Sequence, residues 1–112
     1  MTSFSELLNK KIKEIDWDAD GIHFTTFDGE TFKYVPMGNC CAHAYIESFD
    51  NVDWLIGEEI ISGDHLTFNS EDTEYGVIDY HRYSISSKKG TASIELRVSH
   101  NGYYGGWLEF VK

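Results

Sequence analysis

The sequence contains few residues that interrupt or cross-link a chain: one proline, Pro36, and two cysteines, Cys40 and Cys41, in 112 residues. A single proline beside ten glycines excludes a proline-rich linker and a collagen-like repeat. Two cysteines do not form the disulfide framework of a small secreted domain, so we expect a reducing compartment, the cytoplasm.

Long apolar segments are also missing from the chain. No segment approaches the roughly 18 consecutive apolar residues that a membrane-spanning helix needs. The first fifteen residues lack the basic segment and apolar run of a secretory signal. We therefore expect no membrane partner, and at this length we expect one domain covering residues 1–112.

Basic residues are scarce: nine Lys and Arg stand against nineteen Asp and Glu, for a formal net charge of −10. Residues 1–79 hold seventeen acids and four bases, a net of −13, whereas residues 80–112 hold two acids and five bases, a net of +3. A negative field repels phosphates, which argues against direct binding of nucleic acid. It favours a basic protein surface as partner, and the alternative is that the charge only keeps the protein soluble.

Alternating apolar and polar residues are the main structural signal. In residues 91–99, Ala92, Ile94, Leu96 and Val98 alternate with polar residues, which is typical of a strand with one buried face. Asp28-Gly29 predicts a two-residue hairpin turn. We expect an α+β fold, mostly antiparallel β, with a single curved or barrel-like sheet and one or two short helices.

The expected elements follow from the same patterns. Ser3 and Glu6 fit a capping box, which predicts a short helix over residues 2–9, and a second helical turn is expected before Gly57. The polar residues 69–76 predict a mobile loop. We expect Leu96 and Phe110 to face inward from a final hairpin, with Glu95 facing outward. The expected strands cover residues 11–17, 22–27, 30–35, 39–49, 58–68, 77–87, 91–99 and 107–111.

Four short motifs resemble a family of small phage and prophage proteins of unknown function. They are Asp-Gly-Glu-Thr-Phe-Lys-Tyr at 28–34, Asn-Cys-Cys-Ala-His-Ala-Tyr-Ile-Glu at 39–47, Leu-Ile-Gly at 55–57 and His-Asn-Gly-Tyr-Tyr at 100–104. The chain departs from the family pattern at Ala42, where an acid is usual. The resemblance implies a bacterial host cell as the setting and implies no particular activity.

Cys41 and His43 are the residues most suited to metal chemistry, since alternate residues on a strand share a face. Cys40 and Cys41 point to opposite faces of a strand, and the usual spacing of a second ligand pair is missing. We therefore expect no metal and no cofactor. A small Cys/His-dependent metal-binding protein or enzyme remains an alternative function.

Two surfaces are candidates for binding a partner. The first is acidic, with carboxylates at Asp16, Asp18, Asp20, Asp50, Asp53, Glu58 and Glu59. The second is a Gly-rich aromatic loop with Tyr103, Tyr104 and Trp107, a composition typical of recognition loops. We expect a non-enzymatic, phage-type accessory protein that binds a basic protein surface and inhibits a host nucleic-acid-handling or defence protein. The further alternative is a structural or self-assembling phage protein, which would make the chain a homo-oligomer.

Overall fold

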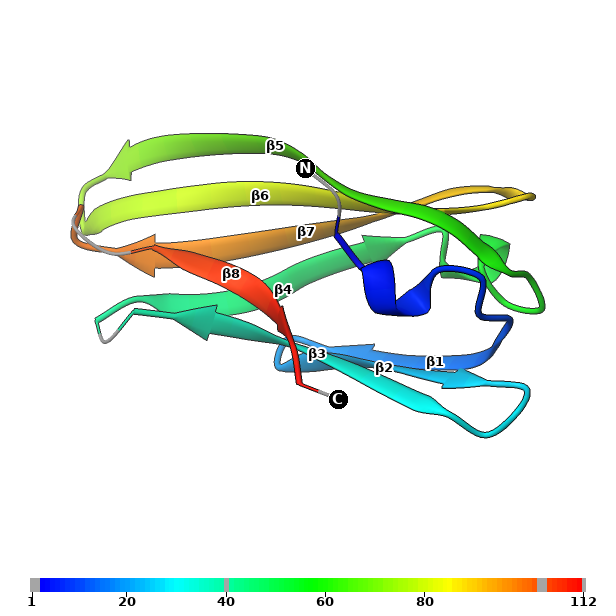
Figure 1. Cartoon of the computed structure of the whole chain (residues 1–112). Helices are drawn as coiled ribbons and strands as arrows, with labels where there is room; N and C mark the ends of the chain where they lie inside the picture. The colour runs from blue at the N-terminus through cyan, green and yellow to red at the C-terminus, as the bar shows by residue number, and fades with distance from the viewer. Residues whose placement is uncertain (1–2, 40, 103–104, 112) are drawn as a thin grey trace.

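The computed structural model describes residues 3–39, 41–102 and 105–111, which form eight strands in two antiparallel sheets (Figure 1). One sheet has the order β1-β2-β3-β8, with bounds β1 (Ile12–Asp18), β2 (Gly21–Thr26), β3 (Thr31–Gly38) and β8 (Gly106–Phe110). The other has the order β4-β7-β6-β5, with bounds β4 (His43–Asp50), β7 (Gly90–His100), β6 (Gly76–Ser87) and β5 (Ile60–Thr73). Two 3-10 turns, η1 (Ser5–Leu7) and η2 (Val52–Trp54), complete the described chain.

The expectation of an α+β fold with a single curved or barrel-like sheet is wrong. Neither sheet closes on itself, and the helical content of the described residues is limited to η1 and η2. The antiparallel pairing was predicted correctly, but the expected strand over residues 39–49 begins only at His43, with Cys41 in the preceding turn, and the one expected over residues 58–68 runs on to Thr73. The alternation in residues 91–99 shows that one face is buried, but it does not show whether the same sheet or a second sheet covers that face.

The hydrophobic core lies between the two sheets. Ile22 and Phe24 of β2 face it from one side, and Ile94 and Leu96 of β7 face it from the other, all fully buried. Phe24 and Phe49 of β4 contact each other across the interface, with ring centroids 6.3 Å apart. This two-layer packing places the polar side chains of both sheets on two opposite outer faces.

The N-terminal segment forms only the short turn η1 instead of a helix over residues 2–9. Phe4 and Asn9 both adopt left-handed backbone conformations, with φ of 62° and 67°, which stop a helix on either side of η1. The segment pairs with β5 instead: the Ser3 N–H donates to the Gly63 carbonyl at 2.9 Å, and the Asn9 N–H donates to the Ile60 carbonyl at 2.9 Å. Pairing with β5 therefore replaces the predicted capping box.

Gly63 permits this close approach. A Cβ at position 63 would lie against the Ser3 carbonyl oxygen and 2.9 Å from the Cβ of Phe4. The glycine that weakens the strand pattern in the sequence therefore marks a point where two backbones meet.

Residues 69–76 form the end of the β5–β6 hairpin, so the predicted mobile loop is wrong. The pairs Asn69↔Tyr80, Glu71↔Ile78 and Thr73↔Gly76 continue the ladder to the tip. With 14 residues at about 3.3 Å each, β5 spans close to the 45 Å long dimension of the molecule. Backbone pairing with β6 holds this polar segment in a strand although its side chains gain little burial.

The C-terminal strand does not form a hairpin with β7. β8 pairs with β3, through Tyr34↔Phe110 and Met37↔Trp107, and so adds a fourth strand to the first sheet. Leu96 and Phe110 consequently belong to different sheets. The chain crosses from one sheet to the other between His100 and Gly106 (Figure 1).

Candidate functional site

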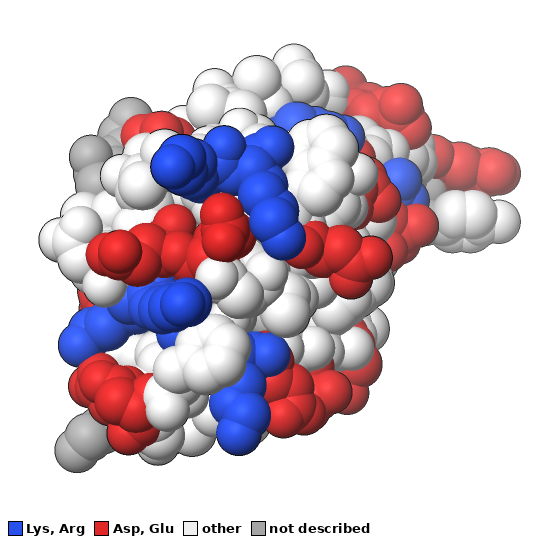
Figure 2. Space-filling view, turned by 90° about the vertical axis from the view of Figure 1, so that its right-hand side faces the viewer, with Lys and Arg blue, Asp and Glu red and all other residues white. Residues whose placement is uncertain are grey.

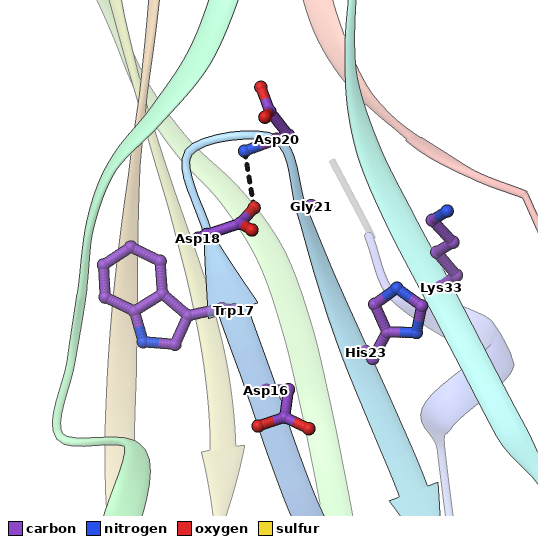
Figure 3. A pocket seen from close by; sticks show the side chains of 7 residues that line it. All are labelled: Asp16, Trp17, Asp18, Asp20, Gly21, His23 and Lys33. Atoms are coloured by element: carbon purple, nitrogen blue, oxygen red, sulfur yellow. Dashed lines mark hydrogen bonds between the residues drawn. The ribbon is translucent and has the colours of Figure 1, made fainter.

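The β1–β2 turn brings together three of the predicted acidic residues. Asp16, Asp18 and Asp20 line an open hollow of about 400 Å³, together with Trp17 and His23 (Figure 3). The Asp18 side chain accepts a hydrogen bond of 2.8 Å from the Asp20 backbone N–H, which stabilises the turn. All three carboxylates are exposed to solvent.

A cross-strand row continues this hollow over the outer face of the first sheet. Asp16 on β1 pairs with His23 on β2, and His23 pairs with Lys33 on β3. Residues directly opposite each other on paired strands project to the same face of the sheet, so the three side chains lie on the same side. Lys33 contributes one positive charge to a rim that otherwise carries three carboxylates.

Asp50 lies on β4, an end strand of the second sheet that runs beside β1. The Ile46 N–H of β4 donates to the Ala19 carbonyl of the β1–β2 turn at 3.0 Å. Trp17 of β1 and Phe49 of β4 have ring centroids 6.2 Å apart. The edges of β1 and β4 therefore lie side by side, and Asp50 directly follows Phe49 while Asp53 lies exposed in η2.

Glu58 and Glu59 lie among lysines. The Ile12 N–H donates to the Glu58 carbonyl at 3.1 Å, and the backbones of Glu59 and Lys11 form an isolated antiparallel β-bridge. Both glutamates share one hollow with Lys11 and Lys88. Figure 2 shows Lys and Arg side chains interspersed with Asp and Glu over this end of the molecule. The predicted acidic residues therefore divide into a strongly acidic group at the β1–β2 turn and a charge-mixed group at the start of β5.

The aromatic loop is described only in part. Trp107 lies at the start of β8, 40% exposed, and its indole N–H donates to Glu109 at 3.2 Å. Tyr103 and Tyr104 lie outside the described residues.

Cys41 and His43 are both exposed, on and just after the turn that leads into β4. The His43 ring stacks on Tyr45, with centroids 5.5 Å apart. Within the described part of the chain, no three His, Cys, Asp or Glu side chains are placed to hold a metal ion together.

The structure reveals a polar cluster that the sequence patterns did not indicate. Asp79 is buried on β6, where its carboxylate accepts a hydrogen bond of 2.6 Å from Ser70 and lies 2.8 Å from His100. Next to it, Nε2 of His65 and Nδ1 of His81 form a hydrogen bond 3.0 Å long. These residues come from β5, β6 and β7, and their sequence separations of 9 to 21 residues hide the cluster until the strands pair.

Burial is the main cause of the perturbed titration of His81. Burial lowers the pKa of His81 below its ordinary value, the neighbouring His65 lowers the pKa further, and Asp79 opposes the change. Across the core, burial and the hydrogen bond to Glu6, 2.7 Å long, raise the pKa of Tyr34. Both groups are therefore held in their neutral forms at neutral pH.

The protein is expected to lose stability in mild acid through His81. Because its pKa is lower in the folded protein than in the unfolded chain, protonation favours unfolding. The contribution of the neutral ring is present above the ordinary value of 6.5 and is lost as the pH falls below it. Thermal unfolding at about pH 7.5 and about pH 5.5 should show a smaller pH-dependent shift for His81→Gln than for the parent protein. An equal shift in the parent and in His81→Gln would show that His81 is not responsible.

Sequence patterns also missed the edge of β5. Residues 66–72 are all exposed, including the apolar Leu66 and Phe68. The length of the predicted loop could have indicated this edge. A loop over residues 69–76 is longer than most hairpin loops, which favours longer strands joined by a short turn.

These features define a class: a small, two-sheet, all-β domain with an acidic turn and a long sheet edge. The chain belongs to the family described as a domain of unknown function, DUF7448, whose sequence profile matches residues 5–110. Searches for similar proteins among curated sequences and among solved structures found no match. In the described residues, no helix has the length and apolar character needed to cross a membrane.

Proposed function

We propose that this protein acts by binding a basic partner protein, without catalysis of its own. The observation that carries the proposal is the convergence of Asp16, Asp18 and Asp20 on one exposed hollow that contains a single lysine. Trp17, 39% exposed, borders this hollow from the opposite face of β1, where its ring packs against Phe49 of β4 with centroids 6.2 Å apart.

These closely spaced carboxylates would fit a partner surface that ordinarily binds the phosphates of nucleic acid. Duplex DNA carries about one charge per 1.7 Å of its axis, so competition for a basic site needs several carboxylates held close together. The β1–β2 turn holds three within five residues, and Asp50 lies on the neighbouring edge. On this basis the protein would occupy the basic site of a nucleic-acid-handling or defence protein and inhibit it.

The setting follows from the resemblance to small phage and prophage proteins. A protein of that kind acts in the cytoplasm of a bacterial host, where many nucleic-acid-handling proteins present basic surfaces. The net charge of −10 supports fast, electrostatically steered association with such a surface.

The proposal is tested with a partner captured from host lysate and then purified. Replacing Asp16, Asp18 and Asp20 by asparagine should slow its association without unfolding the domain, because the amide oxygen introduced at position 18 can still accept the hydrogen bond from the backbone N–H of residue 20. The association rate of the parent protein should also fall as salt is raised, since the Debye length is about 8 Å at physiological ionic strength. Stopped-flow or surface-based kinetics measures both effects.

A variant with equal charge change provides the control. Asp28→Asn, Glu58→Gln and Glu59→Gln remove three charges near Lys10 and Lys11 and should slow association less than the β1–β2 variant. Equal rates for all three proteins at every salt concentration would contradict the proposal and leave the charge a role in solubility.

A further inference from the structure

The outer edge of the second sheet is covered only over its first part. β5 is an end strand in the order β4-β7-β6-β5, and the N-terminal segment bonds to it at Ile60 and Gly63. Within the described chain, no backbone hydrogen bond from outside the sheet reaches β5 beyond Gly63. Figure 1 shows the rest of β5 running as the outermost strand to the tip of the β5–β6 hairpin.

The direction of the backbone groups along this edge follows from the pairing. In an antiparallel ladder, alternate residues turn their N–H and C=O groups away from the partner strand. The Gly63 carbonyl faces away from β6, because it accepts from Ser3. Counting onward through the bulge between His65 and Thr67 assigns the same orientation to Phe68, Ser70 and Asp72.

The turn at the tip of the β5–β6 hairpin leads to the same assignment of outward-facing residues. Glu74 and Tyr75 form a two-residue loop between the paired Thr73 and Gly76. The residues that close such a loop bond to each other, so Thr73 faces β6 and its neighbour Asp72 faces outward. The edge therefore presents a regular series of backbone donors and acceptors.

The side chains of this edge supply both apolar anchors and charge. Leu66 is 54% exposed and Phe68 is 53% exposed. Glu71, Asp72 and Glu74 are exposed, and residues 60–81 contain five acids and no Lys or Arg. Natural proteins protect open sheet edges with charged residues, proline, bulges or a covering segment, and this part of β5 has acids and the bulge between His65 and Thr67 but neither lysine nor proline.

Charge decides which occupant fits. Pairing of two β5 strands from two copies of this chain would bring their acids together with no base in either strand, and like charges oppose such pairing. A strand that carries Lys or Arg between apolar residues would complement both the acids and the exposed Leu66 and Phe68.

We propose that the open edge of β5, residues 65–73, binds an extended Lys- and Arg-rich segment of a partner protein as an added strand. Main-chain hydrogen bonds supply affinity in this mode of recognition, and alternate side chains supply specificity. The proposal rests on the proposed function for the basic character of the partner, and it names a different surface from the β1–β2 turn.

Ser70 gives a variant that blocks the edge without changing its charge. Proline at position 70 removes an N–H that faces away from β6, and proline is tolerated on sheet edges where the N–H faces solvent. Ser70→Ala removes the same hydroxyl, and with it the hydrogen bond to Asp79, but retains the N–H. Asp72→Pro and Asp72→Ala form a second pair if Ser70→Pro does not fold.

The probe is a synthetic peptide of alternating Val and Lys, long enough to span residues 65–73. The parent protein and Ser70→Ala should bind it with similar affinity in a fluorescence anisotropy titration. Ser70→Pro should bind it about tenfold or more weakly, because one bond is lost and the ring obstructs the added strand. Hydrogen exchange should slow at Phe68 and Asp72, and a peptide of alternating Val and Glu should not bind.

Equal affinity of Ser70→Pro and Ser70→Ala would overturn the edge proposal. Binding that is lost in the Asp16, Asp18, Asp20 asparagine variant instead would also overturn it, while supporting the proposed function. Binding of neither the Val-Lys peptide nor any basic partner would contradict both. A dimer seen by light scattering in the parent and lost in Ser70→Pro would assign the edge to a second copy of the chain and overturn the basic-segment proposal.

Discussion

Replacement of Leu96 by alanine is expected to lower the free energy of unfolding by about 2–5 kcal/mol, the range for large-to-small changes in protein cores. Leu96 is fully buried on β7, between Ile46 of β4 and His81 of β6 in the ladder. Truncation removes apolar burial and leaves a cavity at the interface between the sheets, where both layers are already paired and have little freedom to collapse. Denaturant unfolding followed by tryptophan fluorescence measures the loss.

Leu66→Ala is the matched control, because the same atoms are removed from a side chain that is 54% exposed on β5. Its cost should be below about 1 kcal/mol, as for most surface substitutions. Glu95 is a poor control although it lies on the outer face. Its carboxylate pairs with Arg82 at 3.2 Å and with Arg97 at 2.8 Å, so Glu95→Ala would remove an ion pair from Arg82 and leave Arg97 with Glu47, 3.5 Å away. Similar costs for the two leucine variants would show that the inward assignment of Leu96 is wrong.

Replacement of Phe4 by alanine should cost about 3–5 kcal/mol, the usual range for a buried phenylalanine. Phe4 is 5% exposed, and its ring contacts Tyr34 of β3 and Tyr83 of β6, with centroids 4.9 and 5.9 Å away. Phe4 belongs to neither sheet, and its ring packs against one residue of each. Alanine keeps a Cβ at a backbone φ of 62°, so the left-handed strain persists and the loss reports the ring.

Phe27→Ala serves as the control for Phe4, because Phe27 is 57% exposed beside the β2–β3 turn. Hydrogen exchange provides a second measurement: loss of the Phe4 ring should release the N-terminal segment and speed exchange at Ser3 and Asn9, whose N–H groups bond to β5. Unchanged stability in Phe4→Ala would mean that the segment is not part of the folded core.

Local patterns in the sequence determined several features correctly. Ala92, Ile94, Leu96 and Val98 are all buried, as their spacing predicted. A turn forms at Asp28-Gly29, with Gly29 at a φ of 88° that glycine adopts without strain, but the loop between β2 and β3 is longer than the predicted two residues, since the Thr26 N–H donates to the Glu30 carbonyl. Asp16, Asp18 and Asp20 line one hollow because they are alternate residues at the end of β1 and in the turn that follows.

The candidate sites also differ in whether their residues are close together in the sequence. The acidic turn was predictable because its members are neighbours in the chain. The cluster around Asp79 and the open edge of β5 were not, since their members meet only through pairing of β5, β6 and β7. The mixed charge around Glu58 and Glu59 likewise depends on tertiary structure, because Lys88 shares their hollow from the β6–β7 turn.

The sequence by itself determined which strand faces are apolar, where the tightest turns fall and how strongly acidic the protein is, because these properties depend on residues a few positions apart. Only the tertiary structure decided that there are two sheets, that β8 joins β3, and that the N-terminal segment lies along β5. A period of two residues states that a face must be buried, and any apolar face of matching shape satisfies it. The choice among such faces is made by packing of the whole chain at once, here by Phe4 and the close approach at Gly63 that bring the N-terminus onto the sheet edge.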